Sequence, residues 1–379
     1  MSLRIAMYSH NGFGLGHIRR NLLLAEGLLR RRPNADVLVI TGSAGLHAFP
    51  LSGNVDYVKL PSVRKLGTRR WRPYNLDMAM EHLLSIRRTM ILESVRAYRP
   101  HLFVADFLPE GVEGELLPAL EELEARSDAR AVIGFRDILD DPDTIRTAWK
   151  EDGTYDVLDK LYNLVLIYGD PQWFDFSHYG LDPGIPRYVG LLANERGPQP
   201  RGIRETASVL ATCGGGADGY PVLAAALEGT HQVHSDLKPI RCTAVTGPLM
   251  PQADFDRLNA IAKRVNGRVH RVHDRYQSKL LRTTAMIAMA GYNTVCDILS
   301  LRMPALIIPR PGPSGEQTIR AQILAERGLA KVLKLADCTD REVAQAIGAL
   351  LGDWTFPEEA MPRLGGLGPA VDALLEILE

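Results

Sequence analysis

Cysteine, net charge and long apolar runs are all scarce in this chain of 379 residues. The four cysteines are widely spaced and form no C-x-x-C pair, so we expect reduced structural thiols rather than a zinc or redox centre. Lys and Arg number 44 against 45 Asp and Glu, so no overall field favours a nucleic-acid partner or an anionic membrane. No signal-peptide pattern and no 18-residue apolar stretch is present, which predicts a cytoplasmic protein.

The length of the chain predicts two domains, because single cores rarely grow beyond about 250–300 residues. Apolar residues make up 46% of the chain and charged residues 23%, the ordinary mixture of a globular protein. A stretch rich in Gly, Pro and charge at 191–202 lies where two equal halves would join. We therefore predict a first domain at 1–193, a second at 203–358 and a tail at 359–379 that ends in a helix.

Short Val/Ile/Leu-rich runs alternate with longer amphipathic stretches, which predicts an α/β fold with parallel strands. First-half strands are expected at 4–8, 35–40, 55–59, 102–105, 131–135 and 164–167, with helices at 18–31, 76–98 and 111–125. Second-half strands are expected at 208–211, 241–246, 268–271, 285–288, 305–308 and 330–333. Each half opens with a strand, a glycine-rich turn and a helix, which favours a ligand cleft between the halves.

The glycine-rich turns, at 10–17 and 213–219, are suited to an anion, because their backbone amides can approach it closely. They are also suited simply to tight strand-to-helix packing. A nicotinamide site would need an acidic residue at the end of the second strand. The second strands end instead in Thr41-Gly42 and Thr246-Gly247, which argues against a dehydrogenase.

His17 is the strongest candidate for a catalytic residue in the first half of the chain. It follows Gly16 at the predicted start of a helix, where the helix dipole lowers the pKa of an imidazole and suits it to act as a general base. The alternative is a histidine that caps or packs its own helix. Asp106 and Asp137 follow later strands, so either carboxylate is a candidate to orient His17 or bind an acceptor hydroxyl.

A second acidic cluster, Asp137 to Asp143, includes a D-x-D spacing that holds a metal in some sugar-nucleotide enzymes. Asp143 precedes a helical pattern and is a good N-cap, so we expect no metal site. A basic stretch with one aromatic, from Arg64 to Arg72, is either a solvated loop or a loop that receives an anionic or extended acceptor.

In the second half, a predicted strand runs into Gly291, and Asn293 or Thr294 is expected to cap the helix that follows. The first-turn amides of that helix would point at an anion, and Asp297, one turn further on, suits the two hydroxyls of a ribose. A rigid loop then ends in Glu316 and Gln317, whose side chains can form hydrogen bonds with hydroxyls. A phosphate cradle, a diol-binding carboxylate and a polyol-binding pair together describe a nucleotide sugar.

These motifs resemble a known family. The loop Gly12-Phe-Gly-Leu-Gly-His17 resembles the N-terminal loop of MurG-like glycosyltransferases. The segment Ala290-Gly-Tyr-Asn-Thr-Val-Cys-Asp297, with Pro304 to Pro309 and Glu316-Gln317, resembles their donor-binding segment. The resemblance spans nearly the whole chain, and is greatest to a branch of predicted glycosyltransferases. It implies the GT-B fold, in which two Rossmann-like domains face each other across a cleft.

The resemblance also implies site residues. His17 would be the catalytic base or an acceptor ligand, and Asp106 and Asp137 stay the candidates to orient it on the strength of their places after strands. The binding set would be Gly14 and Gly16 in the first loop, Gly214, Gly215, Gly216, Gly291, Tyr292, Asn293 and Thr294 around the diphosphate, and Arg310. Asp297 would bind the ribose, Glu316 and Gln317 the sugar, and the backbone around His273 the nucleobase. The family residue at position 297 is usually Glu, and the second glycine loop of the family usually reads Gly-Gly-Ser-x-Gly, so this chain departs from the pattern at both places.

The sequence therefore predicts an inverting glycosyltransferase that uses a nucleotide-diphosphate sugar as co-substrate, with UDP-GlcNAc favoured and no obligatory metal or other cofactor. Its acceptor would be a small molecule, a lipid-linked sugar or a natural product, with at most peripheral membrane contact. Two alternatives stay open: a non-hydrolysing UDP-GlcNAc 2-epimerase and a non-catalytic nucleotide-sugar-binding subunit. The oligomeric state is not indicated.

Overall fold

The computed structural model describes residues 2–10, 16–43, 45, 51, 53–67, 70–193, 207–233, 240–272, 276–312, 314–352 and 354–379. The chain divides into two compact units. The first comprises Met1–Leu192 with Pro362–Glu379, and the second comprises Ala193–Met361. Most of the predicted linker, from residue 194 on, lies outside the described residues. The C-terminal tail is part of the first unit.

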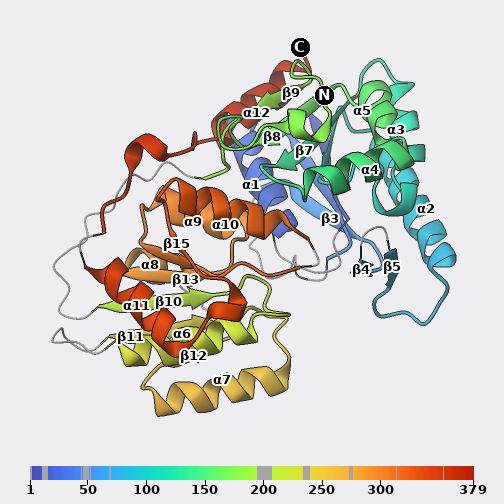
Figure 1. Cartoon of the computed structure of the whole chain (residues 1–379). Helices are drawn as coiled ribbons and strands as arrows, with labels where there is room; N and C mark the ends of the chain where they lie inside the picture. Colours follow the sequence, from blue (N-terminus) through green and yellow to red (C-terminus); the bar gives the residue numbers. More distant parts are fainter. Residues whose placement is uncertain are drawn as a thin grey trace. The chain divides into compact units, whose positions relative to one another are not determined.

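The first unit is built on a parallel sheet with the strand order β3-β2-β1-β6-β7-β8-β9 (Figure 1). These strands are β1 (Arg4–Ser9), β2 (Asp36–Thr41), β3 (Val55–Lys59), β6 (Leu102–Asp106), β7 (Arg130–Arg136), β8 (Leu164–Tyr168) and β9 (Pro186–Tyr188). They follow the predicted runs closely, because strands covered by helices on both faces are apolar along their whole length. The predicted α/β fold is confirmed for this unit.

The helices of the first unit are α1 (Gly16–Arg31), α2 (Met80–Tyr98), α3 (Leu117–Glu124), α4 (Pro142–Asp152), α5 (Thr154–Leu161) and α12 (Leu367–Glu376), with 3-10 turns at Val112–Gly114 and Phe176–Tyr179. The tail helix α12 packs on α1 at Gly27, where a Cβ atom would lie 2.7 Å from the side chain of Val371. The glycine therefore allows the two helices to approach closely.

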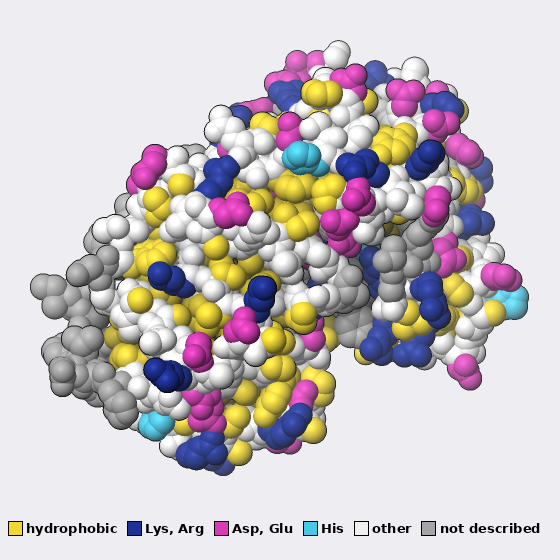
Figure 2. Space-filling model, viewed as in Figure 1, with side chains coloured by type: hydrophobic (Ala, Val, Ile, Leu, Met, Phe, Trp, Pro, Cys, Tyr) yellow, Lys and Arg dark blue, Asp and Glu magenta, His cyan; other side chains and the backbone are white. Residues whose placement is uncertain are grey.

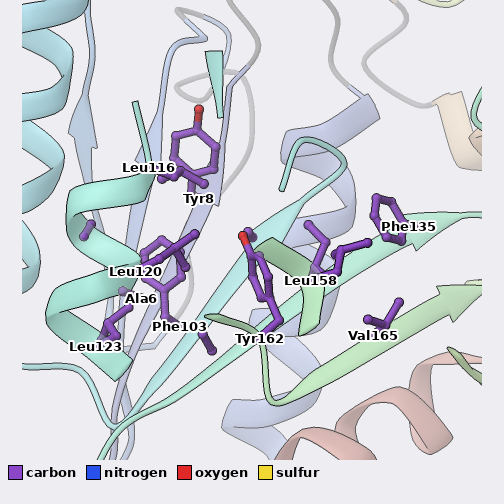
Figure 3. Packing of buried hydrophobic residues seen from close by; sticks show 14 of the residues in the cluster. Ala6, Tyr8, Phe103, Leu116, Leu120, Leu123, Phe135, Leu158, Tyr162 and Val165 are labelled. Atoms are coloured by element: carbon purple, nitrogen blue, oxygen red, sulfur yellow. The ribbon is translucent and has the colours of Figure 1, made fainter. Parts of the chain in front are cut away.

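The core of the first unit lies between the sheet and the helices that follow β5 and β6. Figure 3 shows Tyr8 and Phe103 of the sheet beside Leu116 and Leu120 of the α3 segment. All four side chains are fully buried. This packing fixes the sheet whose carboxyl end carries the candidate catalytic residues.

The second unit has a parallel sheet with the order β12-β11-β10-β13-β14-β15. Its strands are β10 (Ser208–Thr212), β11 (Arg241–Val245), β12 (Arg268–His270), β13 (Ala285–Ala288), β14 (Ala305–Ile307) and β15 (Lys331–Val332). Its helices are α6 (Tyr220–Gln232), α7 (Gln252–Arg264), α8 (Tyr276–Leu281), α9 (Tyr292–Ser300), α10 (Glu316–Glu326) and α11 (Asp340–Leu351), with 3-10 turns at Leu335–Asp337 and Glu358–Ala360. Within the described part of the chain, no helix combines the length and apolarity needed to span a bilayer.

Candidate active site

Each sheet reverses its strand order at one point, and the candidate residues gather there. In the first unit the reversal lies between β1 and β6, which pair in parallel from Ile5 and Leu102 to Ser9 and Asp106. In the second unit it lies between β10 and β13. Open α/β sheets bind ligands beyond the carboxyl ends of the strands at such a switch point. Each unit therefore has one favoured ligand-binding edge.

His17 and Asp106 form a buried pair at the switch point of the first unit. His17 lies in the first turn of α1, Asp106 ends β6, and His17 Nδ1 lies 2.6 Å from Asp106 Oδ2. Both side chains are buried, with relative exposures of 8% and 1%. The structure therefore selects Asp106, rather than Asp137, as the carboxylate that orients His17.

Arg20 completes this arrangement and was missed by the sequence analysis. It lies one turn after His17 on α1, is 2% exposed, and donates from Nη2 to both oxygens of Asp106 at 3.0 and 2.9 Å. Nη2 also lies 2.8 Å from Nδ1 of His17, but the ionised carboxylate of Asp106 can only accept a hydrogen bond, so its 2.6 Å contact with Nδ1 needs a proton on Nδ1. Nδ1 therefore donates its own proton to Asp106, which leaves the lone pair of Nε2 available as a base.

The electrostatics favour a neutral imidazole beside a charged carboxylate. Burial lowers the pKa of His17 below its ordinary 6.5; Asp106 opposes this shift and Arg20 reinforces it. Burial alone would raise the pKa of Asp106, but Arg20 and His17 hold that pKa well below its usual range. At neutral pH His17 can accept a proton, as a general base must.

The rings of His10 and Phe107 lie beside that of His17. The ring of His10 lies 5.0 Å from that of His17, 5.6 Å from Trp71 and 5.8 Å from Phe107, between centroids. Phe107 follows Asp106 directly with a positive φ of 77°, and the guanidinium of Arg136 lies over its ring at 4.6 Å. A non-glycine residue in this backbone region is strained, and such strain is often found at functional sites.

Protonation of the two buried histidines is expected to destabilise the fold in mild acid. Burial lowers the pKa of His10 well below 6.5, and the pKa of His17 is lowered as well. Below about pH 6.5 the unfolded chain binds more protons at these positions than the folded chain, so the free energy of unfolding falls as the pH falls.

Thermal unfolding at pH 7.5 and 5.5 tests this expectation. The unfolding midpoint should drop at the lower pH, and the drop should be smaller in the double variant His10→Gln/His17→Gln. The exposed His82→Gln serves as the matched control and should keep the full drop. An equal drop in the double variant and in the wild type would show that other groups cause it.

The basic stretch of the sequence forms a hairpin rather than the predicted loop. Strands β4 (Val63–Gly67) and β5 (Arg70–Pro73) pair antiparallel, with Lys65 opposite Trp71. Trp71 points to His10, whereas Arg64, Lys65, Arg70 and Arg72 are exposed. Figure 2 shows Lys and Arg side chains gathered over β4 and β5 beside hydrophobic surface. The hairpin thus presents cations to solvent and one aromatic ring to the site.

A glycine cradle follows β10 in the second unit. Gly214 and Gly216 have positive φ values of 66° and 96°, and Gly247 one of 83°. A Cβ on Gly216 would lie 2.0 Å from the carbonyl oxygen of Thr246, and one on Gly247 would lie 2.2 Å from that of Gly214. Only glycine fits where the loops after β10 and β11 pack backbone against backbone. Gly215 accepts a hydrogen bond from the amide of Leu249 at 2.9 Å.

Helix α9 begins beside this cradle, after β13. Its N-cap is Gly291, which offers no side chain to cap the helix. The prediction that Asn293 or Thr294 is the cap was wrong, because both lie within the first turn together with the buried Tyr292. The first-turn amides are therefore not capped by the N-cap side chain and suit an anion. Asp297 lies in the second turn of α9 and is partly exposed.

The polar pair predicted to hold a sugar lies at the start of α10. Glu316 and Gln317 are both buried, and Gln317 Oε1 accepts from the backbone amide of Arg310 at 3.2 Å. Arg320, another residue that the sequence analysis missed, is fully buried one turn further along. It donates to the carbonyl of Ala290 at 2.7 Å and lies 4.0 Å from Glu316. Arg320 thus ties α10 to the residue before the α9 N-cap.

The structure describes some of the remaining predicted residues but not others. Gly14 and His273 lie outside the described residues, whereas Gly16 begins α1. Asp137 is buried and accepts from the amide of Ile138 at 2.9 Å. The N-cap of α4 is Asp141 rather than the predicted Asp143, because Asp141 accepts from the amide of Thr144. In the described ranges, no group of three or more His, Cys, Asp or Glu is placed to hold a metal.

Comparisons with known proteins bear on the class of this protein. Residues 223–366 match the glycosyltransferase family 28 C-terminal domain. The UDP-N-acetylglucosamine--N-acetylmuramyl-(pentapeptide) pyrophosphoryl-undecaprenol N-acetylglucosamine transferase of Desulforudis audaxviator is 24% identical over 402 residues, covering 96% of this chain and 95% of that protein. The enzyme of the same name from Lactiplantibacillus plantarum is 28% identical over 138 residues, which span 36% of this chain and only 38% of that protein.

Solved structures share the fold at low sequence identity. The glycosyltransferase of kitacinnamycin has a TM-score of 0.65 at 15% identity and is covered over 100% of both chains. Acinetobacter baumannii MurG has a TM-score of 0.62 at 13% identity, with 99% of both chains covered. A putative UDP-N-acetylglucosamine 2-epimerase from Listeria monocytogenes has a TM-score of 0.60 at 10% identity, with 99% of this chain and 95% of that chain covered.

The fold is GT-B, with one Rossmann-like sheet in each unit, and most of the second unit matches a glycosyltransferase domain. The chain is MurG-like, since the family 28 domain covers most of the second unit and the likeness to the D. audaxviator transferase runs over nearly the whole chain. The resemblance predicted from the sequence is thereby confirmed.

Proposed function

We propose that this enzyme moves a sugar from a nucleotide-diphosphate sugar, with a UDP-sugar such as UDP-GlcNAc favoured, to a hydroxyl or amine of a small-molecule, lipid-linked or natural-product acceptor. The observation that carries the proposal is the buried His17–Asp106 pair, which is built as a general base at the switch point of one sheet. The glycine cradle and the α9 N-terminus, at the switch point of the other sheet, support a diphosphate site. The names of the curated relatives support UDP-N-acetylglucosamine as the donor.

In this proposal the first unit activates the acceptor. Nε2 of His17 takes the proton of the acceptor hydroxyl or amine while its oxygen or nitrogen attacks C1 of the sugar. The bond from C1 to the nucleoside diphosphate breaks in the same step, so the configuration at C1 inverts. Asp106 holds the imidazole in the correct tautomer and stabilises the imidazolium that forms, and Arg20 keeps Asp106 ionised.

The second unit would hold the donor. The diphosphate would bind the amides of the loop at Gly214–Gly216 and of the first turn of α9, where the helix dipole favours the leaving negative charge. Asp297 would bind the ribose hydroxyls, and Glu316 with Gln317 the hydroxyls of the sugar. Because amides and the helix end stabilise the leaving group directly, we propose that the reaction needs no metal ion.

Calorimetric titration with UDP, dTDP, GDP, ADP and NAD, each with Mg²⁺ and with EDTA, tests the donor site. We expect UDP to bind equally well in both buffers. Asp297→Ala should weaken UDP about 10–100-fold, since a hydrogen bond to a charged group contributes about 1.5–3 kcal/mol. Asp297→Glu, the residue usual in the family, should keep most of the affinity, and the exposed Asp256→Ala on α7 should keep all of it.

Binding of NAD, or of no nucleotide, would contradict the donor site. Incubation with UDP-GlcNAc alone distinguishes a transferase from a 2-epimerase. The 2-epimerase is the alternative because the putative 2-epimerase from Listeria monocytogenes has the same fold as this chain. An epimerase would interconvert the donor with its 2-epimer in the absence of an acceptor, whereas a transferase would not.

A further inference from the structure

An ion pair joins two loops at the carboxyl edge of the second sheet. Arg310, in the loop after β14, donates from Nη1 to Oδ2 of Asp218, in the loop after β10, at 3.2 Å. The two side chains are 92 residues apart in sequence and partly exposed, at 31% and 44%. Salt bridges with this exposure contribute little to stability, so a structural role alone accounts poorly for the pair.

The strand order places this pair at the proposed phosphate site. Strand β13 lies between β10 and β14 in the sheet, and α9 starts directly after β13. A side chain that reaches from the β14 loop to the β10 loop must therefore pass the carboxyl end of β13. Arg310 and Asp218 therefore lie on either side of the sheet edge at which α9 begins. The N-cap of α9 is Gly291, which has no side chain.

Arg310 also has an N–H donor that its contact with Asp218 does not use. Its Nε is buried and donates to none of the described residues, while its backbone amide is fixed by Gln317 at 3.2 Å. A guanidinium presents five donors in a planar fork that matches a phosphate oxygen pair. The anchored backbone allows the side chain to change partner without movement of the loop.

We propose that Asp218 and Arg310 form a donor-operated latch: Arg310 leaves Asp218 and binds the β-phosphate of the nucleotide sugar when the donor enters. This inference rests on the proposed function. It adds a role for Asp218, whose carboxylate takes the place of the phosphate beside Arg310 until the donor enters. A phosphate and a carboxylate compete for one guanidinium, and the diphosphate prevails because it carries more charge and meets the α9 amides as well. Arg310 thereby distinguishes nucleoside diphosphates from monophosphates.

Titration with UDP and UMP in the wild type and three variants tests the latch. Arg310→Gln should weaken UDP about 10–100-fold, the range expected for a charge-assisted hydrogen bond, and change UMP less than about threefold. Asp218→Asn should tighten UDP about 2–5-fold, because Arg310 no longer has a partner to leave. The double variant should behave like Arg310→Gln alone, because Asp218 acts only through Arg310.

The matched control is Arg264→Gln, which removes a surface ion pair with Glu228 in the same unit and should leave both titrations unchanged. Weaker UDP binding in Asp218→Asn, or equal losses of UDP and UMP in both single variants, would show a structural clasp and overturn the latch. Unchanged UDP binding in Arg310→Gln would also overturn it. If the wild type binds no UDP at all, the proposed donor site itself fails, and the latch fails with it.

Discussion

Replacing His17 with glutamine is expected to lower the rate of sugar transfer about 10²–10⁴-fold while leaving the affinity for UDP unchanged. That range is the usual contribution of a general base. Nε2 of His17 is the proton acceptor that the Asp106 contact leaves available, and glutamine presents an amide that cannot take a proton at neutral pH. The nucleotide is held by the second unit in our proposal, so its binding does not need the imidazole.

The measurement is the initial rate with a saturating donor, paired with calorimetry on the same samples. The exposed His82→Gln is the control and should keep the full rate. Asp106→Asn should also lose activity, since an amide can hold the imidazole in the wrong tautomer. Full activity in His17→Gln would rule out His17 as the base and turn attention to the neighbouring carboxylates. Loss of UDP binding together with activity would indicate a change in the fold instead.

The sequence predicted much of the sheet, because the signal there is local. Strands at 55–59 and 285–288 have the same bounds in the structure as in the prediction. Buried parallel strands are short apolar runs between turn residues, and such runs can be read from neighbouring residues alone. The hairpin β4–β5 was missed because its basic residues, Arg64, Lys65, Arg70 and Arg72, resemble those of a solvated loop.

The candidate site was only partly predictable. His17 and Asp106 were both singled out, but the choice between Asp106 and Asp137 depends on which strand lies beside β1. That neighbour is β6, whose last residue, Asp106, lies 89 residues after His17 in the sequence. Strand order is a property of the whole sheet. The i+3 spacing from His17 was the one signal in the sequence that could have indicated Arg20.

Buried arginines were the main omission, because a charged residue in an amphipathic helix is usually exposed. Arg20, Arg87 and Arg320 are all 2% exposed or less, and each has a carboxylate within 4.0 Å. Their partners come from a strand, a loop or the preceding helical turn. Pairing is what makes their burial tolerable, and it cannot be read from hydrophobic periodicity.

Replacing Arg87 with methionine is expected to lower the stability of the first unit by about 3–5 kcal/mol, the cost of leaving one partner of a buried ion pair alone. Arg87, on α2, and Glu115 are both fully buried and joined by two hydrogen bonds of 2.5 Å. Tyr8 of β1 also donates to Glu115, and Arg87 donates to the carbonyl of Pro61 at 2.6 Å. The network thus links β1, α2 and the segment that leads into the Trp71 hairpin.

Differential scanning calorimetry should show the unfolding midpoint of Arg87→Met reduced by about 6–20 °C, at about 2–4 °C per kcal/mol for a unit of this size. Arg96→Met on the same helix is the matched control, because its ion pair with Glu122 is exposed to solvent and contributes little to stability. Arg87→Met/Glu115→Leu should recover part of the loss, since no unpaired charge stays buried, although the Tyr8 hydroxyl then loses its acceptor. A midpoint within 1 °C of the Arg96→Met control would show that water reaches Glu115 once Arg87 is gone. A double variant no more stable than Arg87→Met would place the cost in lost packing rather than in the buried charge.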